Sequence, residues 1–193
     1  MRKAVMLSIR PKWVEKIASG EKTIEVRKTK PKLETPFKCY IYCTLPKYPH
    51  EDFIATDYPR PQFYGGKVVG EFTCDQIIDA WWDYVPDAIT REVTGGNLEA
   101  LDGIGMTDEE LFSYVGDSMR GHCYGWHISD LRIYDAPKKL GEFWRDCLEY
   151  SELSTNCWSC ENVCGDGDET DCNTDGRLYL HRPPQSWCYV EEG

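Results

Sequence analysis

The hydrophobic pattern of residues 1–27 predicts a strand, a helix and a second strand. Residues 4–8, of which 4–7 are apolar, have the length of a short buried strand, and Pro11 suits the first position of a helix, where its missing N–H is not needed. Apolar side chains recur over residues 13–18 at the three-and-four spacing of one helical stripe, and Gly20 suits the left-handed residue after a helix end. Polar and apolar residues alternate over residues 23–27, which predicts a strand with one polar face.

The rest of the chain alternates between strand-like and helical stretches. Strand character recurs at residues 39–44, 67–78, 124–134 and 186–190. Residues 139–150 are predicted to be helical, and a Pro- and Tyr-rich loop is expected at residues 45–66. An acidic helical insertion at residues 80–118 is expected to cover one end of the sheet, with Thr107 and Glu110 as the capping box of a helix. Single helices between alternating strands favour an α+β fold whose mixed or antiparallel sheet curls into a small β-barrel.

Length and composition are typical of a single domain covering residues 1–193. The chain has 193 residues, of which 41% are hydrophobic, so it can bury a core, and it has no charged run long enough to be a disordered tail. No stretch approaches the roughly 18 uninterrupted apolar residues that a membrane-spanning helix needs. The basic first residues are followed by only a short apolar run before Arg10, which does not resemble an export signal. We therefore expect a soluble, cytoplasmic protein.

The charge is divided unevenly along the chain. Residues 1–70 hold 14 Lys and Arg against 7 Asp and Glu, a net charge of +7, whereas residues 71–193 hold 8 against 26, a net charge of −18; together they give the overall −11. A basic face could therefore bind an anionic ligand although the whole chain is acidic. The alternative, which the sequence leaves open, is that these charges are only solvated surface.

Four of the ten cysteines crowd a Cys-rich insert at residues 151–176, and these are Cys157, Cys160, Cys164 and Cys172. Four thiolates can saturate a tetrahedral zinc ion, so a structural zinc site is predicted there. His181 could replace one cysteine as a ligand, and free thiols or redox pairs are the alternatives. The remaining cysteines lie mostly in apolar or aromatic runs and are expected to be reduced core residues: Cys39, Cys43, Cys74, Cys123, Cys147 and Cys188.

The segment Gly20-x-Lys22-x-x-Glu25-x-Arg27 resembles the signature Gly-x-Lys-x-x-(Glu or Thr)-x-Arg of the ASCH domains, which are relatives of the PUA domain. Further stretches are similar to members of bacterial and phage origin: residues 7–11, 124–131, 134–137 followed by Leu140, and 182–188. The resemblance covers most of the chain apart from the Cys-rich insert and part of the acidic middle. It implies a PUA-like barrel with a cleft lined by polar signature residues, and activities centred on RNA or nucleosides.

One branch of the ASCH domains hydrolyses the acetyl amide of acetylcytidine with a lysine, a threonine and a glutamate. Carried over by position, the lysine corresponds to Lys22 and the glutamate to Glu71, but Glu25 stands where the threonine would be. A threonine hydroxyl can attack once a neighbouring amine removes its proton, whereas a carboxylate attacks an amide poorly and would more readily pair with Lys22 or Arg27. A hydrolase would then need Glu71 or Glu25 as the general base for water, and Lys22 or Arg27 to stabilise the oxyanion.

Three interpretations of the cleft stay open. The first is a module that binds RNA or a modified nucleoside through Ser8, Arg10, Lys22, Glu25, Arg27 and Trp126. In this module one or two of five aromatic residues could stack a base, although such residues usually belong to the core: Trp81, Trp82, Tyr124, Trp126 and Trp187. The second is an amidohydrolase with Lys22, Glu25 and Glu71 as catalytic groups, and the third is an ion-pair network that only braces the mouth of the barrel. A separate alternative is a zinc-stabilised module that binds a basic protein partner through the acidic residues 71–193.

Overall fold

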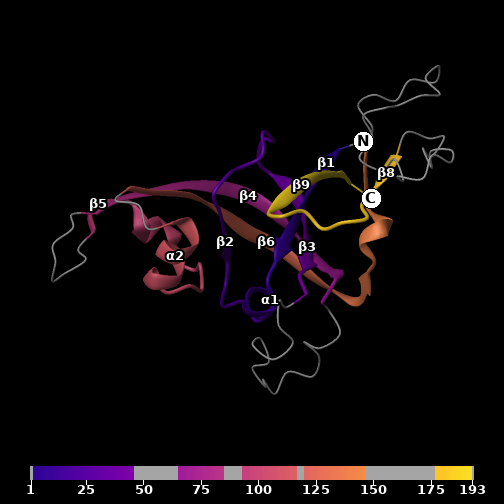
Figure 1. The fold of residues 1–193 in the computed structure, drawn as a ribbon, viewed down its shortest axis with the longest axis horizontal. Coiled ribbons are helices and arrows are strands. Elements are labelled where there is room, and N and C mark those ends of the chain that lie inside the picture. The colour runs from indigo at the N-terminus through magenta and orange to yellow at the C-terminus, as the bar shows by residue number, and fades with distance from the viewer. Residues whose placement is uncertain (1, 46–64, 85–92, 117–119, 147–176, 193) are drawn as a thin grey trace, which may run out of the picture.

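The computed structural model has an α+β fold built on one large mixed sheet (Figure 1). It describes residues 2–45, 65–84, 93–116, 120–146 and 177–192. Within these ranges the seven-stranded sheet has the order β2-β6-β4-β3-β1-β9, with β5 paired to β4, and β7 and β8 form a separate two-stranded sheet. The predicted α+β class is confirmed. No helix in the described ranges is long and apolar enough to cross a membrane.

The N-terminal strand and helix follow the predicted pattern. Strand β1 (Lys3–Ile9) pairs in parallel with β3 (Phe37–Cys43) and antiparallel with β9 (Trp187–Glu191). Helix α1 (Pro11–Ala18) starts with its proline in the first turn. Gly20 follows it with a φ of 80°, a conformation that a residue without a Cβ adopts readily. The first predicted strand–helix unit is therefore confirmed.

Strand β2 (Ile24–Arg27) is buried on both faces. Ile24 and Val26 belong to the apolar cluster that also holds residues of the 98–115 insertion. Glu25 and Arg27 point the other way because side chains alternate along a strand, and they too are almost inaccessible to solvent. The polar face predicted for this strand therefore lies inside the protein.

Strands β4 (Lys67–Tyr84) and β6 (Arg120–Lys138) form a long antiparallel ribbon. The register between them shifts at three places, and at one of these Asp130 takes a φ of 49°. Such bulges bend a ribbon and increase its twist, so its far part leaves the body of the sheet, where it pairs with β5 (Val93–Gly96) (Figure 1). Strand β4 thus runs beyond the predicted end at residue 78.

The insertion folds back under the far part of this ribbon (Figure 1). The helical insertion predicted at residues 80–118 is wrong over residues 80–84 and 93–96, which are strand. Its described helical part, residues 98–115, contains the 3-10 helix η2 (Leu98–Leu101) and the helix α2 (Asp108–Val115). Thr107 and Glu110 form both hydrogen bonds of the predicted capping box. The apolar side of the insertion packs against Trp82 of β4, so the insertion covers this end of the sheet as expected.

The helix predicted at residues 139–150 is wrong over its described part. Leu140–Glu142 form only the 3-10 turn η3, and Trp144–Asp146 form strand β7, paired with β8 (Arg177–Tyr179). Leu140 and Phe143 are buried in one apolar cluster, and this packing together with the available strand partner overrides helix propensity. The last four residues of the predicted helix lie outside the described ranges.

The barrel predicted from the sequence is not closed by backbone hydrogen bonds in the described part of the chain. The strand path ends at β2 on one side and at β9 on the other. We call the gap between these two strands the seam. Side chains bridge it. Trp187 Nε1 of β9 donates a 3.0 Å hydrogen bond to Thr29 Oγ1, just after β2. The Arg27 guanidinium lies 3.4 Å from Ser186 Oγ.

Candidate functional site

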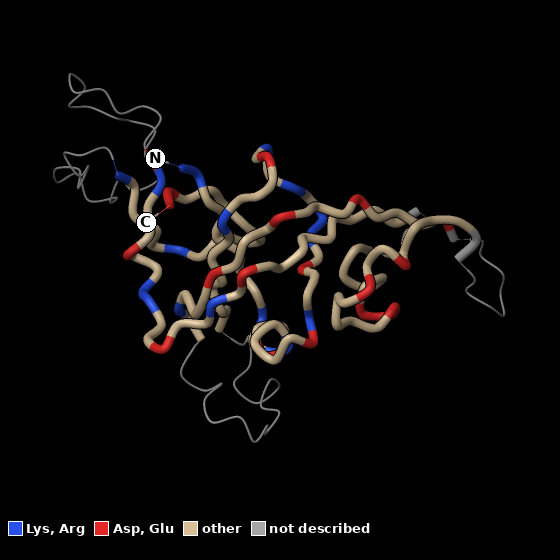
Figure 2. Tube along the Cα trace, turned by 180° about the vertical axis from the view of Figure 1, so that it is seen from behind, with Lys and Arg blue, Asp and Glu red and all other residues tan. Residues whose placement is uncertain are grey.

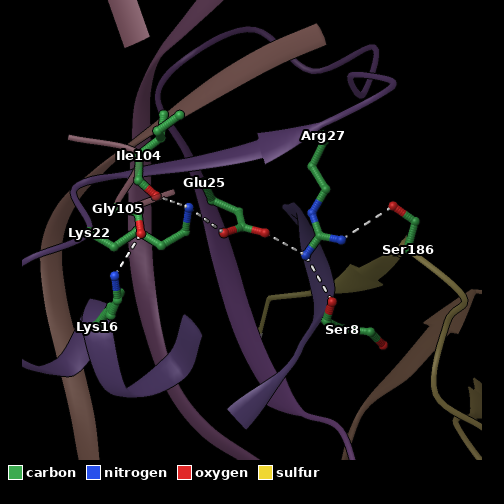
Figure 3. Close-up of polar contacts among 8 residues, drawn as sticks. All are labelled: Ser8, Lys16, Lys22, Glu25, Arg27, Ile104, Gly105 and Ser186. Carbon is green, nitrogen blue, oxygen red and sulfur yellow. Dashed lines mark hydrogen bonds and ion pairs between the residues drawn. The ribbon is translucent and has the colours of Figure 1, made fainter. Parts of the chain in front are cut away.

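Lys22, Glu25 and Arg27 of the sequence signature form a continuous ion-pair chain (Figure 3). Lys22 Nζ lies 3.4 Å from Glu25 Oε2, and Arg27 Nη2 lies 3.0 Å from Glu25 Oε1. The three side chains are 1%, 8% and 7% exposed, respectively. Two cations flank one carboxylate in this dry environment, so each charge has a partner that compensates for lost hydration.

The ammonium of Lys22 is occupied by protein groups. It donates a 2.7 Å hydrogen bond to the carbonyl oxygen of Ile104 and lies 5.5 Å from the centre of the Trp13 ring. Burial lowers the pKa of Lys22 from its ordinary value, and the neighbouring Glu25 carboxylate partly opposes this shift. The side chain thus ties β2 to the insertion, and it has no open face toward solvent.

Lys22 is one of three lysines that hold the insertion. Lys16 Nζ donates to the carbonyl oxygen of Gly105 at 2.8 Å, and Lys12 Nζ forms a 3.0 Å ion pair with Glu110 (Figure 3 shows the first of these). The backbone adds two further hydrogen bonds, from the N–H groups of residues 23 and 24 to the carbonyl oxygen of residue 103. The insertion is therefore fixed to α1 and β2 by both charged and backbone contacts.

Arg27 connects β2 to the opposite side of the seam. Its Nη2 donates a 2.9 Å hydrogen bond to the carbonyl oxygen of Ser8 in β1, and its Nη1 contacts Ser186 at 3.4 Å (Figure 3). The Nε of Arg27 is buried without a hydrogen-bond partner among the described groups. Tyr114 of α2 lies close to Arg27, and burial raises the pKa of this tyrosine. Arg27 is thus the side chain on which the two edges of the sheet and α2 converge.

Glu71 does not join this chain. It lies on β4, where its Oε2 accepts a 2.5 Å hydrogen bond from the Tyr134 hydroxyl and its Oε1 lies 3.9 Å from Lys38 Nζ. Its sequence neighbour Phe72 points into the main core, so Glu71 must face the other side of the sheet, where Tyr134 is buried in a separate apolar cluster. The predicted grouping of Lys22, Glu25 and Glu71 is therefore not assembled.

The other predicted ligand-binding residues are separated as well. Ser8 is close to the ion-pair chain through its carbonyl oxygen, but its hydroxyl donates to the carbonyl oxygen of Pro184 at 2.6 Å. Arg10 is exposed and stands at the N-cap of α1. Trp126 pairs with Glu25 across β2 and β6, yet it is fully buried in the main core and packs edge-on against Phe37. Trp126 is a core residue in this structure.

The predicted zinc ligands Cys157, Cys160, Cys164 and Cys172 lie outside the described residues, as does Cys147. Within the described ranges no group of three or more His, Cys, Asp or Glu side chains could hold a metal ion. The described cysteines are free thiols, and all but Cys188 are buried. Burial raises the pKa of Cys74 to about 12, so this thiol stays protonated at neutral pH. Its predicted role as a reduced core residue is confirmed.

A group of exposed lysines that the sequence interpretation did not single out follows β2 directly. Lys28, Lys30 and Lys32 alternate along the β2–β3 connection, and all three are exposed. Lys28 Nζ lies 5.6 Å from the centre of the Tyr114 ring, and Lys30 Nζ lies 4.9 Å from the centre of the Tyr124 ring. Figure 2 shows basic residues along this connection. The Lys-x-Lys-x-Lys repeat of residues 28–32 is the sequence pattern from which this group could have been predicted.

Comparison with known proteins finds similarity at the level of solved structures. No family model matches the chain, and no curated protein matches it. A crystal structure of ASCH from Zymomonas mobilis matches with a TM-score of 0.51 and 15% identity over 98% of this chain and 88% of that chain. A serine-to-alanine mutant of the same protein matches with a TM-score of 0.52 and 16% identity over 99% and 90%. At these identities the likeness establishes the fold.

Proposed function

We propose, from the ASCH fold that this chain adopts, that the protein is a non-catalytic module that binds single-stranded RNA. The observation that carries the proposal is that the basic residues of the N-terminal third fall into two kinds. Lys22 and Arg27 are buried and paired with protein groups, whereas the three lysines of the β2–β3 connection are exposed on one loop. Exposed lysines that follow one another along a loop match the charge of a nucleic-acid backbone.

The buried ion-pair chain has a supporting role in this proposal. Arg27, the last residue of β2, donates to the carbonyl oxygen of Ser8, so the lysine loop that follows starts from a fixed position. Lys22, which precedes β2, donates to Ile104 of the insertion and stabilises the fold without contacting the loop. The fixed start of the loop reduces the ordering cost that binding would otherwise carry.

The amidohydrolase alternative is supported less well. It requires a lysine or carboxylate that can reach a substrate amide, together with a general base at hydrogen-bond distance. Lys22 is 1% exposed and donates to Ile104, while Glu71 faces the opposite side of the sheet. These contacts therefore favour a structural role for the ion-pair chain over a catalytic role in amide hydrolysis.

A titration of fluorescently labelled single-stranded RNA tests the proposed function. We expect binding at low salt that weakens about twenty-fold between about 50 and about 200 mM monovalent salt if three phosphates are contacted, because each contact to a single strand contributes about 0.7 to the salt slope. If the protein does not bind the RNA even at the lowest salt concentration, the proposed function is wrong. Binding without any salt dependence would also contradict it, since the lysines could not then be the contact.

A further inference from the structure

The connection after β2 lies across the seam and is held there from the β9 side. Thr29 accepts a 3.0 Å hydrogen bond from the Trp187 indole, and the backbone N–H of Lys32 donates a 2.7 Å hydrogen bond to the Tyr189 hydroxyl. Figure 1 shows the connection rising beside β9. These two contacts fix the backbone of the loop while the lysine side chains remain exposed.

On the other side of the seam the loop faces two tyrosine rings. Lys28 and Lys30 carry their ammonium groups at 5.6 Å from Tyr114 and 4.9 Å from Tyr124, respectively. Tyr114 is 36% exposed, and Tyr124 is partly exposed. Tyr124 packs on one side against the main core and edge-on against His122, so only part of its ring is exposed. An ammonium group therefore stands beside a partly exposed tyrosine ring at two neighbouring positions, and one nucleotide requires this combination of a cation for the phosphate and a ring for the base.

Both tyrosine rings lie next to Arg27. Tyr124 pairs with Arg27 across β6 and β2, and Tyr114 lies close to the same arginine. Arg27 is itself fixed by Glu25 and by the carbonyl oxygen of Ser8. Both tyrosines therefore lie next to a fixed arginine, which reduces the ordering that a ligand would have to impose on the rings.

We propose that Lys28, Lys30, Tyr114 and Tyr124, here called the seam strip, form the surface on which single-stranded RNA binds. Bases stack on the two tyrosine rings, and each lysine moves from a ring face to a phosphate. The inference rests on the proposed function and adds the place and mode of binding. Bases must be unpaired to reach a ring, so the strip selects single strands over duplexes. An acidic peptide would satisfy the lysines but would leave the tyrosine rings without a partner.

The experiment uses the full chain, a labelled single-stranded RNA of mixed sequence and three variants with a matched control. Lys30→Gln removes the cation beside Tyr124, and Tyr124→Leu and Tyr114→Leu each remove one flat ring. The control is Lys138→Gln, because Lys138 is also exposed and lies 5.0 Å from the centre of a tyrosine ring, that of Tyr134, away from the seam. Circular dichroism verifies that each variant keeps the wild-type fold.

The strip predicts a different change for each kind of variant. Each tyrosine variant weakens binding about tenfold and leaves the salt slope unchanged, because it removes stacking alone. The Lys30→Gln variant weakens binding and lowers the salt slope by about 0.7, because it removes one phosphate contact. The control binds as the wild type does, and a duplex of the same sequence binds at least about tenfold more weakly than the single strand.

Three results overturn the inference and can be told apart. If the wild type binds RNA but the strip variants bind as tightly as the Lys138→Gln control, the strip is wrong while the proposed function stands. If the wild type binds no RNA, both fall together. Equal competition by an acidic peptide such as polyglutamate also overturns the inference, because it would show that charge alone accounts for binding.

Discussion

Lys22 Nζ donates a 2.7 Å hydrogen bond to the carbonyl oxygen of Ile104, 82 positions further along the chain. The same ammonium is paired with Glu25 and is almost inaccessible to solvent. Lys22 thus joins the segment before β2 to the insertion. These contacts give Lys22 a structural role, whose loss should be measurable as a loss of stability.

Replacing Lys22 with methionine should destabilise the protein strongly. The variant leaves the Glu25 carboxylate with one cation fewer in a buried site and the Ile104 carbonyl without its donor, so the free energy of unfolding should fall by about 3–5 kcal/mol. Denaturant unfolding measures this change. The control is Lys12→Met, which removes an ion pair whose two side chains are 39% and 38% exposed, and it should change stability by no more than about 1 kcal/mol. Equal effects of the two variants would contradict a structural role for Lys22.

The amidohydrolase alternative predicts a product that the proposed function does not. Purified protein incubated with N4-acetylcytidine should leave the nucleoside unchanged, because Lys22 is occupied and Glu71 is on the other face of the sheet. Chromatography separates acetylcytidine from cytidine. Turnover that disappears in a Glu71→Gln variant of wild-type stability would show that the described arrangement is not the one that reacts.

The local elements were predictable from the sequence because their signals are local. The strand–helix–strand start and the Thr107–Glu110 capping box depend on residues a few positions apart, and both occur as predicted. The ASCH fold, inferred from a short signature, is also the fold that the comparisons find. The prediction of a helix from residue 139 was wrong because Leu140 and Phe143 pack into a cluster of residues that are distant in sequence.

The candidate site was predictable only in part. Lys22, Glu25 and Arg27 do meet, as their spacing indicated, but the alternating pattern of β2 gave no sign that the insertion and the opposite edge of the sheet would bury them. The separation of Glu71 follows from the neighbouring Phe72, which points into the core, once the strand is placed. Of the seam strip, only Tyr124 was among the aromatic residues that the sequence suggested could stack a base. Its combination with a ring of α2 and with lysines after β2 depends on tertiary contacts that no local pattern indicates.

The buried thiols predict a loss of stability at alkaline pH. The pKa of Cys74 is raised by burial from 9.0 to about 12, so between these values the unfolded chain releases a proton that the folded chain keeps. The stability from this group is complete below pH 9 and is lost as the pH rises toward 12. Denaturant unfolding measures how steeply the free energy of unfolding falls between about pH 9 and about pH 11. Replacing Cys74 with alanine removes one titrating proton, so this fall should become shallower by about 1.4 kcal/mol per pH unit. An unchanged slope would show that this thiol is not a protonated core group.

The cysteine cluster of the Cys-rich insert predicts a bound metal. Protein purified without chelator should carry about one zinc ion per chain, as four thiolates saturate one tetrahedral ion. Elemental analysis measures the content. Replacing Cys160 with serine should lower it, whereas Cys123→Ser, which changes a buried thiol of the described fold, should not. Zinc-free protein with four titratable thiols in the insert would leave the free-thiol alternative.

The proposed function divides the basic residues into buried ones that stabilise the fold and exposed ones that would bind RNA. The most direct measurement compares two variants for both RNA affinity and stability: Lys22→Met, and a combined Lys28→Gln, Lys30→Gln and Lys32→Gln variant. The first should lose stability but, while folded, bind RNA within about twofold of the wild type, because Lys22 is not in contact with solvent. The combined variant should keep its stability and bind RNA at least about tenfold more weakly at low salt. The reverse outcome, loss of RNA binding in folded Lys22→Met with full binding in the combined variant, would contradict the division.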